Sequence, residues 1–284
     1  MLQALANGLM LGGLYACVAA GFSLVWGVLN VINMLHGSLI ICAGYLTYFA
    51  WAGAGIHPLA ALPAVAALMF GFGWLLQYLV INRVVSRPVL TTLTLTFGLD
   101  MILYNAMNAV FEATARRITL SWGSLSLGKV VVPMDRLWAM VLALALTGVL
   151  YAVLRGSRAG RAIVAVRMDR DAAALMGIRI PRVYAMTFGI GAGMAGACGV
   201  LFAVAFPVTT NVTGLLLGKA FVVCVIGGLG SVPGALIGGL ALGLIESYGA
   251  HWFGPQNAIT IGFVLMLLLL MLRPTGLLGV KGHE

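Results

Sequence analysis

Charged residues are scarce in this chain. Only 8% of its 284 residues are Asp, Glu, Lys or Arg, whereas 62% are hydrophobic, and the mean hydropathy is +1.09. A soluble core does not need so much apolar surface, and apolar runs of about 20 residues recur along the chain. The composition therefore excludes a soluble protein and predicts an integral helical membrane protein.

Patterns for catalysis and for nucleotide binding are also absent. The nearest approach to a phosphate-binding loop is residues 214–220, where three residues rather than four separate the glycines and an alanine follows Lys219. Glu246 and His251 alone do not make a set of nucleophile, base and orienting group. We therefore expect that the chain is not an enzyme and binds no cofactor itself.

Cysteine and net charge exclude two further classes. The chain has four cysteines, which all lie inside apolar runs without CxxC spacing: Cys17, Cys42, Cys198 and Cys224. They are expected to be small buried hydrophobes rather than disulfides or metal ligands. The formal net charge is +9, but the basic residues cluster at the ends of apolar runs, where they fix membrane topology. Nucleic acid is therefore not an expected partner.

The apolar runs predict a polytopic bundle. They cover residues 5–26, 38–51, 58–81, 89–110, 137–154, 183–206 and 258–272, and region 211–248 adds one or two crossings. The short loop with Arg83 and Arg87, the charged segment 155–182 and Arg273 are basic, which places them in the cytoplasm. We expect one transmembrane domain over residues 1–284, all-α, with about eight transmembrane helices plus broken or re-entrant segments, an external N-terminus and an internal C-terminus.

The charged segment 155–182 stands out in so apolar a chain. It holds seven of the sixteen basic residues and two of the seven acidic ones. Its alanines favour a helix with little side-chain bulk, Gly177 is expected to end this helix, and Pro181 to prevent its quick resumption. Such a helix suits contact with another protein. The alternative is a cytoplasmic loop that only sets orientation.

Two further stretches interrupt the apolar pattern. Residues 27–38 carry Asn30, Asn33 and His36 at a spacing of three, which would put them on one face if the stretch is helical. Their side chains would then face protein or a water-filled path rather than lipid. The alternative is a short loop at the membrane interface. Residues 227–239 hold six glycines and Pro233, a density that breaks a spanning helix. Broken helices often frame transport paths, whereas small residues also allow tight packing.

Three ionisable residues lie within apolar runs. Asp100 is a functional candidate by default, although it is equally compatible with a structural role. Lys219, near an expected helix start, is predicted to extend to the membrane interface. If the chain were an ion-coupled carrier or channel, these two residues and Glu246 would be its ion-linked charges.

Three motifs in this order carry a family resemblance: GLYACVAAGFSLVWGVLNVINMLHGSL, the charged segment GRAIVAVRMDRDAAALMGIRIPRVYAMTF, and KAFVVCVIGGLGSVPGALIGGLALGLIES. Together they resemble the LivH-type permeases of branched-chain amino acid ABC transporters. The likeness extends from about Ala6 to Gly279. Two positions depart from the usual pattern: Asn33-Met-Leu precedes His36, and Ser38 stands where an acidic residue is frequent. Both positions lie in the expected path, so urea or short amides remain alternative substrates.

The resemblance implies a bacterial inner-membrane importer that works by alternating access. A permease of this type pairs with a longer sister subunit, sits on two ATPase subunits that bind ATP and Mg²⁺, and receives substrate from a periplasmic binding protein. Residues 161–177 would form the coupling helix, and the residues assigned to it are Arg161, Ala165, Asp169, Asp171, Ala172, Ala173 and Gly177. The residues assigned to the translocation path are Asn30, Asn33, His36, Ser38, Gly228, Gly230 and Ser231.

Overall fold

The computed structural model is almost entirely helical. It describes residues 1–112, 114–120, 122–127, 130–273 and 276–278. Within these ranges nine helices are long and apolar enough to cross a membrane, in agreement with the predicted polytopic bundle. Their bounds are α1 (Leu2–Leu29), α2 (His36–Ala54), α3 (Pro58–Leu79), α4 (Val89–Phe111), α5 (Met134–Gly156), α8 (Ile180–Ala205), α9 (Thr213–Gly227), α10 (Val232–Phe253) and α11 (Pro255–Leu272). Two short 3₁₀ turns, η1 (Ile81–Arg83) and η2 (Thr210–Val212), follow α3 and precede α9, and they extend these two candidate spans to Pro58–Arg83 and Thr210–Gly227.

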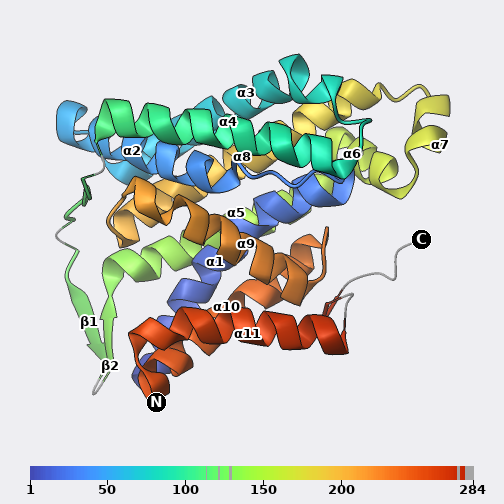
Figure 1. The fold of residues 1–284 in the computed structure, drawn as a ribbon. Coiled ribbons are helices and arrows are strands. Elements are labelled where there is room, and N and C mark those ends of the chain that lie inside the picture. Colours follow the sequence, from blue (N-terminus) through green and yellow to red (C-terminus); the bar gives the residue numbers. More distant parts are fainter. Residues whose placement is uncertain (113, 121, 128–129, 274–275, 279–284) are drawn as a thin grey trace.

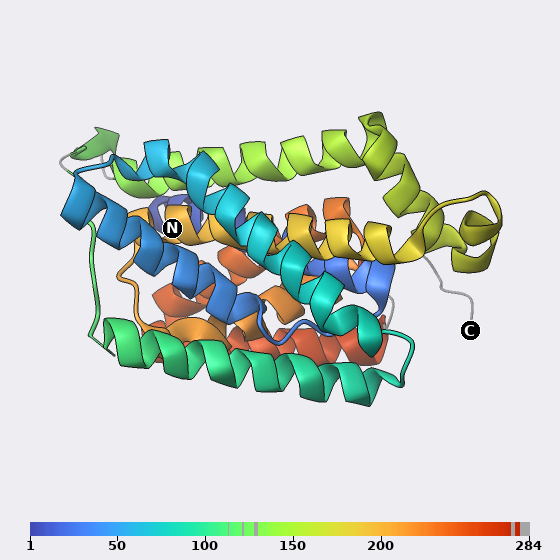
Figure 2. The same cartoon turned by 90° about the horizontal axis from the view of Figure 1, so that it is seen from above.

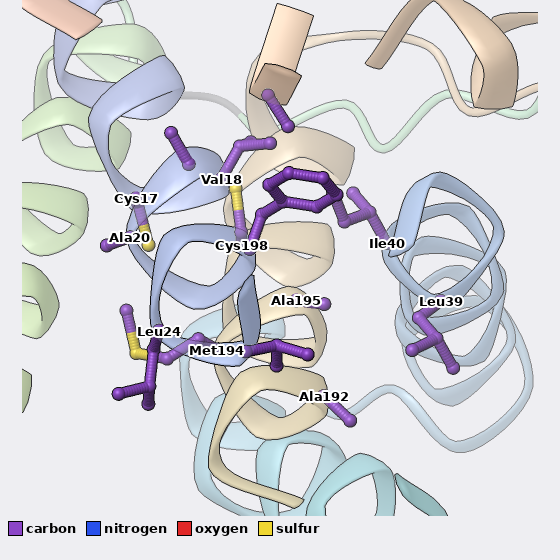
Figure 3. Packing of buried hydrophobic residues seen from close by; sticks show 14 of the residues in the cluster. Cys17, Val18, Ala20, Leu24, Leu39, Ile40, Ala192, Met194, Ala195 and Cys198 are labelled. Carbon is purple, nitrogen blue, oxygen red and sulfur yellow. The ribbon is translucent and has the colours of Figure 1, made fainter. Parts of the chain in front are cut away.

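Helices α1 and α8 form the centre of the bundle. In their most apolar stretches 89% and 83% of residues are buried, against 11% in α4 and 17% in α11, which therefore lie at the periphery. Figure 3 shows side chains of α1, α2 and α8 meeting in this core, among them Cys17 and Cys198. Both thiols and that of Cys224 are free and buried, while Cys42 is half-buried, which confirms that the cysteines are small core residues.

Glycine allows a close contact between α1 and α10. A Cβ atom at Gly243 of α10 would lie 2.3 Å from the backbone nitrogen of Gly12 in α1, and one at Gly239 would lie 2.4 Å from that of Ala16. No side chain fits at these points, so the two backbones pack directly against each other. The glycines of α10 thus serve the tight packing that was the alternative interpretation of region 227–239.

The two ends of the bundle differ in composition. One end carries the basic loop after α3, the charged segment after α5 and residues 276–278, and the other carries the segment between α4 and α5 (Figures 1 and 2). By the positive-inside rule the first end is cytoplasmic. With nine crossings, α1 would then start on the external side and α11 would end on the cytoplasmic side, which is the orientation that the basic residues predict. At the cytoplasmic end Leu277 and Leu278 donate backbone hydrogen bonds to the last carbonyls of α9, on Ile226 and Gly227, at 2.8 and 3.1 Å.

The external segment contains a β-hairpin that the sequence analysis did not predict. Strands β1 (Ser124–Leu127) and β2 (Val130–Pro133) pair antiparallel, with Ser124 opposite Pro133. The side chain of Gln3 at the start of α1 bonds both the N–H and the carbonyl of Val131, at 2.8 and 2.9 Å. The run of valines in β2 is typical of a strand, but four residues among polar ones gave too short a periodic signal.

The structure contains both expected interruptions and defines their extent. Residues 30–35 are not helical: α1 ends at Leu29, its C-cap Asn30 has the left-handed conformation (φ 52°), and α2 begins at His36. The predicted single helical face of Asn30, Asn33 and His36 is therefore wrong. In region 227–239 only residues 228–231 are outside a helix, because Pro233 lies in the first turn of α10, where its missing N–H costs nothing.

Candidate coupling surface and polar path

The charged segment after α5 forms two helices, α6 (Arg158–Met168) and α7 (Arg170–Leu175). They lie at the right end of the bundle in Figure 2. The single helix expected over 161–177 is interrupted at Asp169, whose carboxylate accepts the N–H groups of Asp171 and Ala172, both at 2.9 Å. This is an N-cap, which stabilises the first turn of a helix by about 1 kcal/mol. Asp169 therefore starts α7 as a separate element.

Of the two residues predicted to end the helix of the charged segment, Gly177 agrees with the prediction and Pro181 does not. Gly177 has a φ of 81°, a left-handed conformation that favours glycine, and it comes directly after Met176, the C-cap of α7, as expected of a helix-ending residue. Pro181 does not delay the next helix. It lies in the first turn of α8, which begins one residue earlier at Ile180. Proline is tolerated there because the first N–H groups of a helix have no partner within it.

The outer surface of α6 and α7 is unexpectedly apolar. Met168, Leu175 and Met176 have exposed fractions of 81%, 89% and 83%. Of the seven residues assigned to coupling, Arg161, Asp169, Asp171, Ala172 and Gly177 are exposed, Ala165 is half-buried and Ala173 is buried. The Ala173 side chain thus packs against its own protein and offers no contact surface. The sequence analysis missed the three apolar residues because it weighed the alanines alone.

The polar residues after α1 occupy two environments. Asn33 and His36 are fully buried, and within the described part of the chain neither amide atom of Asn33 has a hydrogen-bond partner. The Nε2 atom of His36 is 2.9 Å from the carbonyl oxygen of Val18 in α1. Ser38 donates a hydrogen bond of 2.5 Å to Oδ1 of Asp100, which joins α2 to the peripheral α4. Asp100 therefore has a polar partner that its sequence context did not indicate.

Asn30 lies apart from the other two, at the cytoplasmic end. It is exposed and borders a cavity of about 340 Å³. Three arginines from separate elements also line this cavity: Arg87, Arg167 and Arg170. The cytoplasmic mouth of the α1–α2 break is therefore strongly basic.

The two interruptions meet at this same end. A Cβ atom at Gly27 would lie 2.7 Å from Cα of Gly230, so the end of α1 and the α9–α10 connection are in direct backbone contact. Arg167 of α6 adjoins the same point, since a Cβ at Gly230 would lie 3.5 Å from its Nη2 atom. Gly228 and Gly230 have positive φ, and Ser231 accepts the N–H of Gly234 at 3.0 Å as the N-cap of α10. One junction thus joins the charged segment to both interruptions.

A buried charge cluster lies deeper in the bundle. Lys219 of α9 forms an ion pair of 2.9 Å with Oε2 of Glu246 in α10, and Tyr15 of α1 donates a 2.8 Å hydrogen bond to the same oxygen. Lys219 also contacts the Tyr15 hydroxyl. The prediction that Lys219 extends to the interface is wrong, because only 8% of the residue is exposed. Sequence gave little signal of the pair, since its members are 27 positions apart in separate apolar runs.

The arrangement suits passage of a solute rather than a reaction. Among the described residues no group of three or more His, Cys, Asp or Glu side chains is placed to hold a metal ion. The features that stand out are an exposed apolar surface on the charged segment, helix interruptions beside it, and polar side chains held at membrane depth. Polar residues at that depth typically mark solute paths in transport proteins.

Comparison with known proteins gives a consistent assignment. The family described as branched-chain amino acid transport system, permease component, matches residues 4–272. The high-affinity branched-chain amino acid transport system permease protein BraD of Pseudomonas aeruginosa is 34% identical, with 98% of this chain and 95% of the relative covered. LivH of Escherichia coli K12, named as a permease of the same kind, is 33% identical over the same shares.

A more distant relative comes from an archaeon. The probable branched-chain amino acid transport permease protein LivH of Methanocaldococcus jannaschii is 25% identical, with 97% of this chain and 92% of the relative covered. No solved structure matches the chain. The family match over most of the sequence, together with relatives above 30% identity that are covered almost in full, shows that this multi-pass membrane protein belongs to the branched-chain amino acid transport permease family.

Proposed function

We propose that this chain is the membrane-spanning permease subunit of an ABC importer and translocates branched-chain amino acids. The names of its relatives support the substrate class. The chain supplies the path, and ATP with Mg²⁺ binds to separate partner subunits. A periplasmic binding protein delivers the substrate, and the permease alternates between outward and inward access.

The observation that carries this proposal is the apolar tip of the cytoplasmic segment. Met168, Leu175 and Met176 are more than 80% exposed, and they lie in the most charged stretch of the chain. Large apolar side chains gathered on a water-facing surface mark a protein contact. The exposed Ala172 beside them leaves room for a close approach. We assign this surface, defined by residues 168, 172, 175 and 176, to docking of the ATPase subunit.

The same segment reaches the translocation path. Arg167 in α6 adjoins Gly230, and Gly230 is in backbone contact with Gly27 at the end of α1. A displacement of α6 by the ATPase would therefore act on both interruptions at once. Because packed interfaces shift between discrete arrangements rather than deform smoothly, this junction is suited to open or close the cytoplasmic end.

The test of this proposal is a co-purification from native membranes in mild detergent. The double substitution Leu175→Glu with Met176→Glu places two charges on the docking surface, and it is expected to remove the ATPase subunit from the purified complex. Ser86→Glu is the matched control, because it adds a charge to an exposed position of another cytoplasmic loop. Retention of the ATPase by the double variant would contradict the assignment.

The remaining partners follow from the same proposal. We expect a sister permease subunit to form a heterodimer with this chain, and the complex to reside in a bacterial inner membrane. Mass spectrometry of the same purification checks both partners. Recovery of two copies of this chain with no second permease would replace the heterodimer by a homodimer.

An ion-coupled carrier is the competing class. Its candidate charges now have partners, because Lys219 and Glu246 pair with each other and Asp100 accepts from Ser38. That pairing favours a structural or binding role over free ion exchange. Uptake into liposomes that contain this chain alone, driven by a proton or sodium gradient, would nevertheless establish the competing class and exclude the ABC assignment.

A further inference from the structure

A second cavity lies among α1, α8 and α9, away from the cytoplasmic junction. It has a volume of about 160 Å³ and ten lining residues, among them Leu11, Tyr15, Val18, Leu215 and Lys219. Each of them is buried or half-buried. Five of them, including Tyr15 and Lys219, are buried and five are half-buried, so the cavity is set into the bundle rather than lying on its exposed surface.

The wall of the cavity is mostly apolar, with two polar side chains. Eight of its ten lining residues are aliphatic or Phe. The other two, Lys219 and Tyr15, contact each other. A lysine ammonium carries three N–H donors. Two are directed to Tyr15 and Glu246, and the described residues provide no acceptor for the third. At membrane depth an ammonium N–H gains much from an anionic oxygen, because the surrounding dielectric is low.

We propose that this cavity binds the amino acid in transit, with the Lys219 ammonium holding its carboxylate and the apolar wall holding its branched side chain. The inference rests on the proposed function and names a site for its substrate. Lys219 and Glu246 together carry no net charge, and a zwitterionic amino acid adds none. A neutral site for a neutral solute avoids the cost of a net charge within the membrane.

The position of the cavity fits such a role. Val18, in its wall, contacts His36 through its carbonyl oxygen, and His36 begins the helix after the α1–α2 interruption. Tyr15 and Gly27 are twelve residues apart on α1, which is about 18 Å at 1.5 Å per residue. The cavity and the cytoplasmic junction therefore lie at two different levels of the same central helix, α1.

The first test uses the complete importer and compares two substitutions on α1. Leu11→Trp fills the cavity, and we expect ATP-dependent leucine uptake to fall by roughly tenfold or more, as for loss of a well-formed ligand contact. Leu9→Trp is the matched control, because Leu9 is exposed and lies outside the cavity. Equal uptake by both variants, with both complexes assembled, would overturn the proposal.

The second test separates ligand binding from a structural role of the charge pair. Leu215→Cys, in a chain whose native cysteines are replaced by alanine, is labelled with a small water-soluble thiol reagent. Leucine should slow the labelling by roughly threefold or more at saturation, whereas leucinamide, which has no carboxylate, should not. The double substitution Lys219→Met with Glu246→Gln leaves no unpaired charge and should abolish the protection.

The outcomes of the second test are distinct. Equal protection by leucinamide, or full protection in the double variant, would overturn the role of Lys219. Absence of any protection by leucine, in an importer that takes up leucine, would overturn the cavity as the binding site. Failure of the proposed function would instead appear as no ATP-dependent leucine uptake by the unsubstituted importer, and this result would overturn both.

Discussion

At single positions, helix packing in this protein depends on the absence of a side chain. We expect Gly243→Ala to lower the thermal midpoint of the detergent-solubilised protein, because its methyl group would lie 2.3 Å from the Gly12 nitrogen. Overpacking of this kind costs about 1–3 kcal/mol. The measurement is a melting curve followed by tryptophan fluorescence.

The control for that variant is another glycine in a membrane helix. Gly148 of α5 has nothing within 4 Å of the added methyl group, so Gly148→Ala should leave the midpoint unchanged or raise it slightly. The gain from replacing a helical glycine by alanine is about 0.5–1 kcal/mol. Similar destabilisation by both substitutions would show that direct backbone contact does not limit the packing of α1 and α10.

Still at single positions, the buried charges are expected to depend on each other. Lys219→Met should destabilise the fold by about 3–5 kcal/mol, because it leaves Glu246 buried without its partner. Adding Glu246→Gln should recover most of this loss. Melting curves of the two single variants and the double variant measure the coupling, and additive effects would contradict it.

Asn33 and Asn30 provide a test of the alternating path. Asn30 is exposed in this conformation and Asn33 is fully buried. In a chain without native cysteines, Asn30→Cys should therefore react with a soluble thiol reagent in the resting state. Asn33→Cys should react only during ATP turnover, when the buried region opens to water. An inert Asn33→Cys under all conditions would place this residue in a packed core.

At the scale of elements, α7 depends on its N-cap. Asp169→Ala removes the acceptor for two backbone N–H groups and should destabilise this short helix by about 1 kcal/mol. We expect faster hydrogen exchange at residues 170–175 and weaker retention of the ATPase subunit. Asp169→Asn keeps a capping oxygen and should behave like the unsubstituted protein. Unchanged exchange in the alanine variant would mean that other contacts hold α7.

For the whole molecule, the nine crossings predict which positions each side of the membrane can reach. In a cysteine-free background, Ser126→Cys in the hairpin should react with an impermeant thiol reagent added outside intact cells. Ala174→Cys in α7 should react only after the membrane is opened, because α7 lies at the end of the bundle opposite to the hairpin (Figure 1). Labelling of Ala174→Cys in intact cells would contradict the topology.

Much of this molecule followed from its sequence because lipid imposes simple rules. Runs of apolar residues must form helices that satisfy their own backbone, and basic residues between them determine orientation. These rules were enough to predict most of the spans, the separation of the charged segment 155–182 from them, and the burial of Cys17, Cys198 and Cys224. The motif resemblance added the family, which the comparisons then confirmed.

Only the tertiary structure decided what the interrupted and charged positions do. It separated Asn30 from Asn33 and His36, brought Gly27 against Gly230, and paired Lys219 with Glu246 across two helices. These relations join residues far apart in the chain, and in an apolar, glycine-rich sequence many pairings satisfy the same local pattern. Which pairing forms depends on how closely whole helices approach, and that is a property of the packed bundle rather than of any single segment.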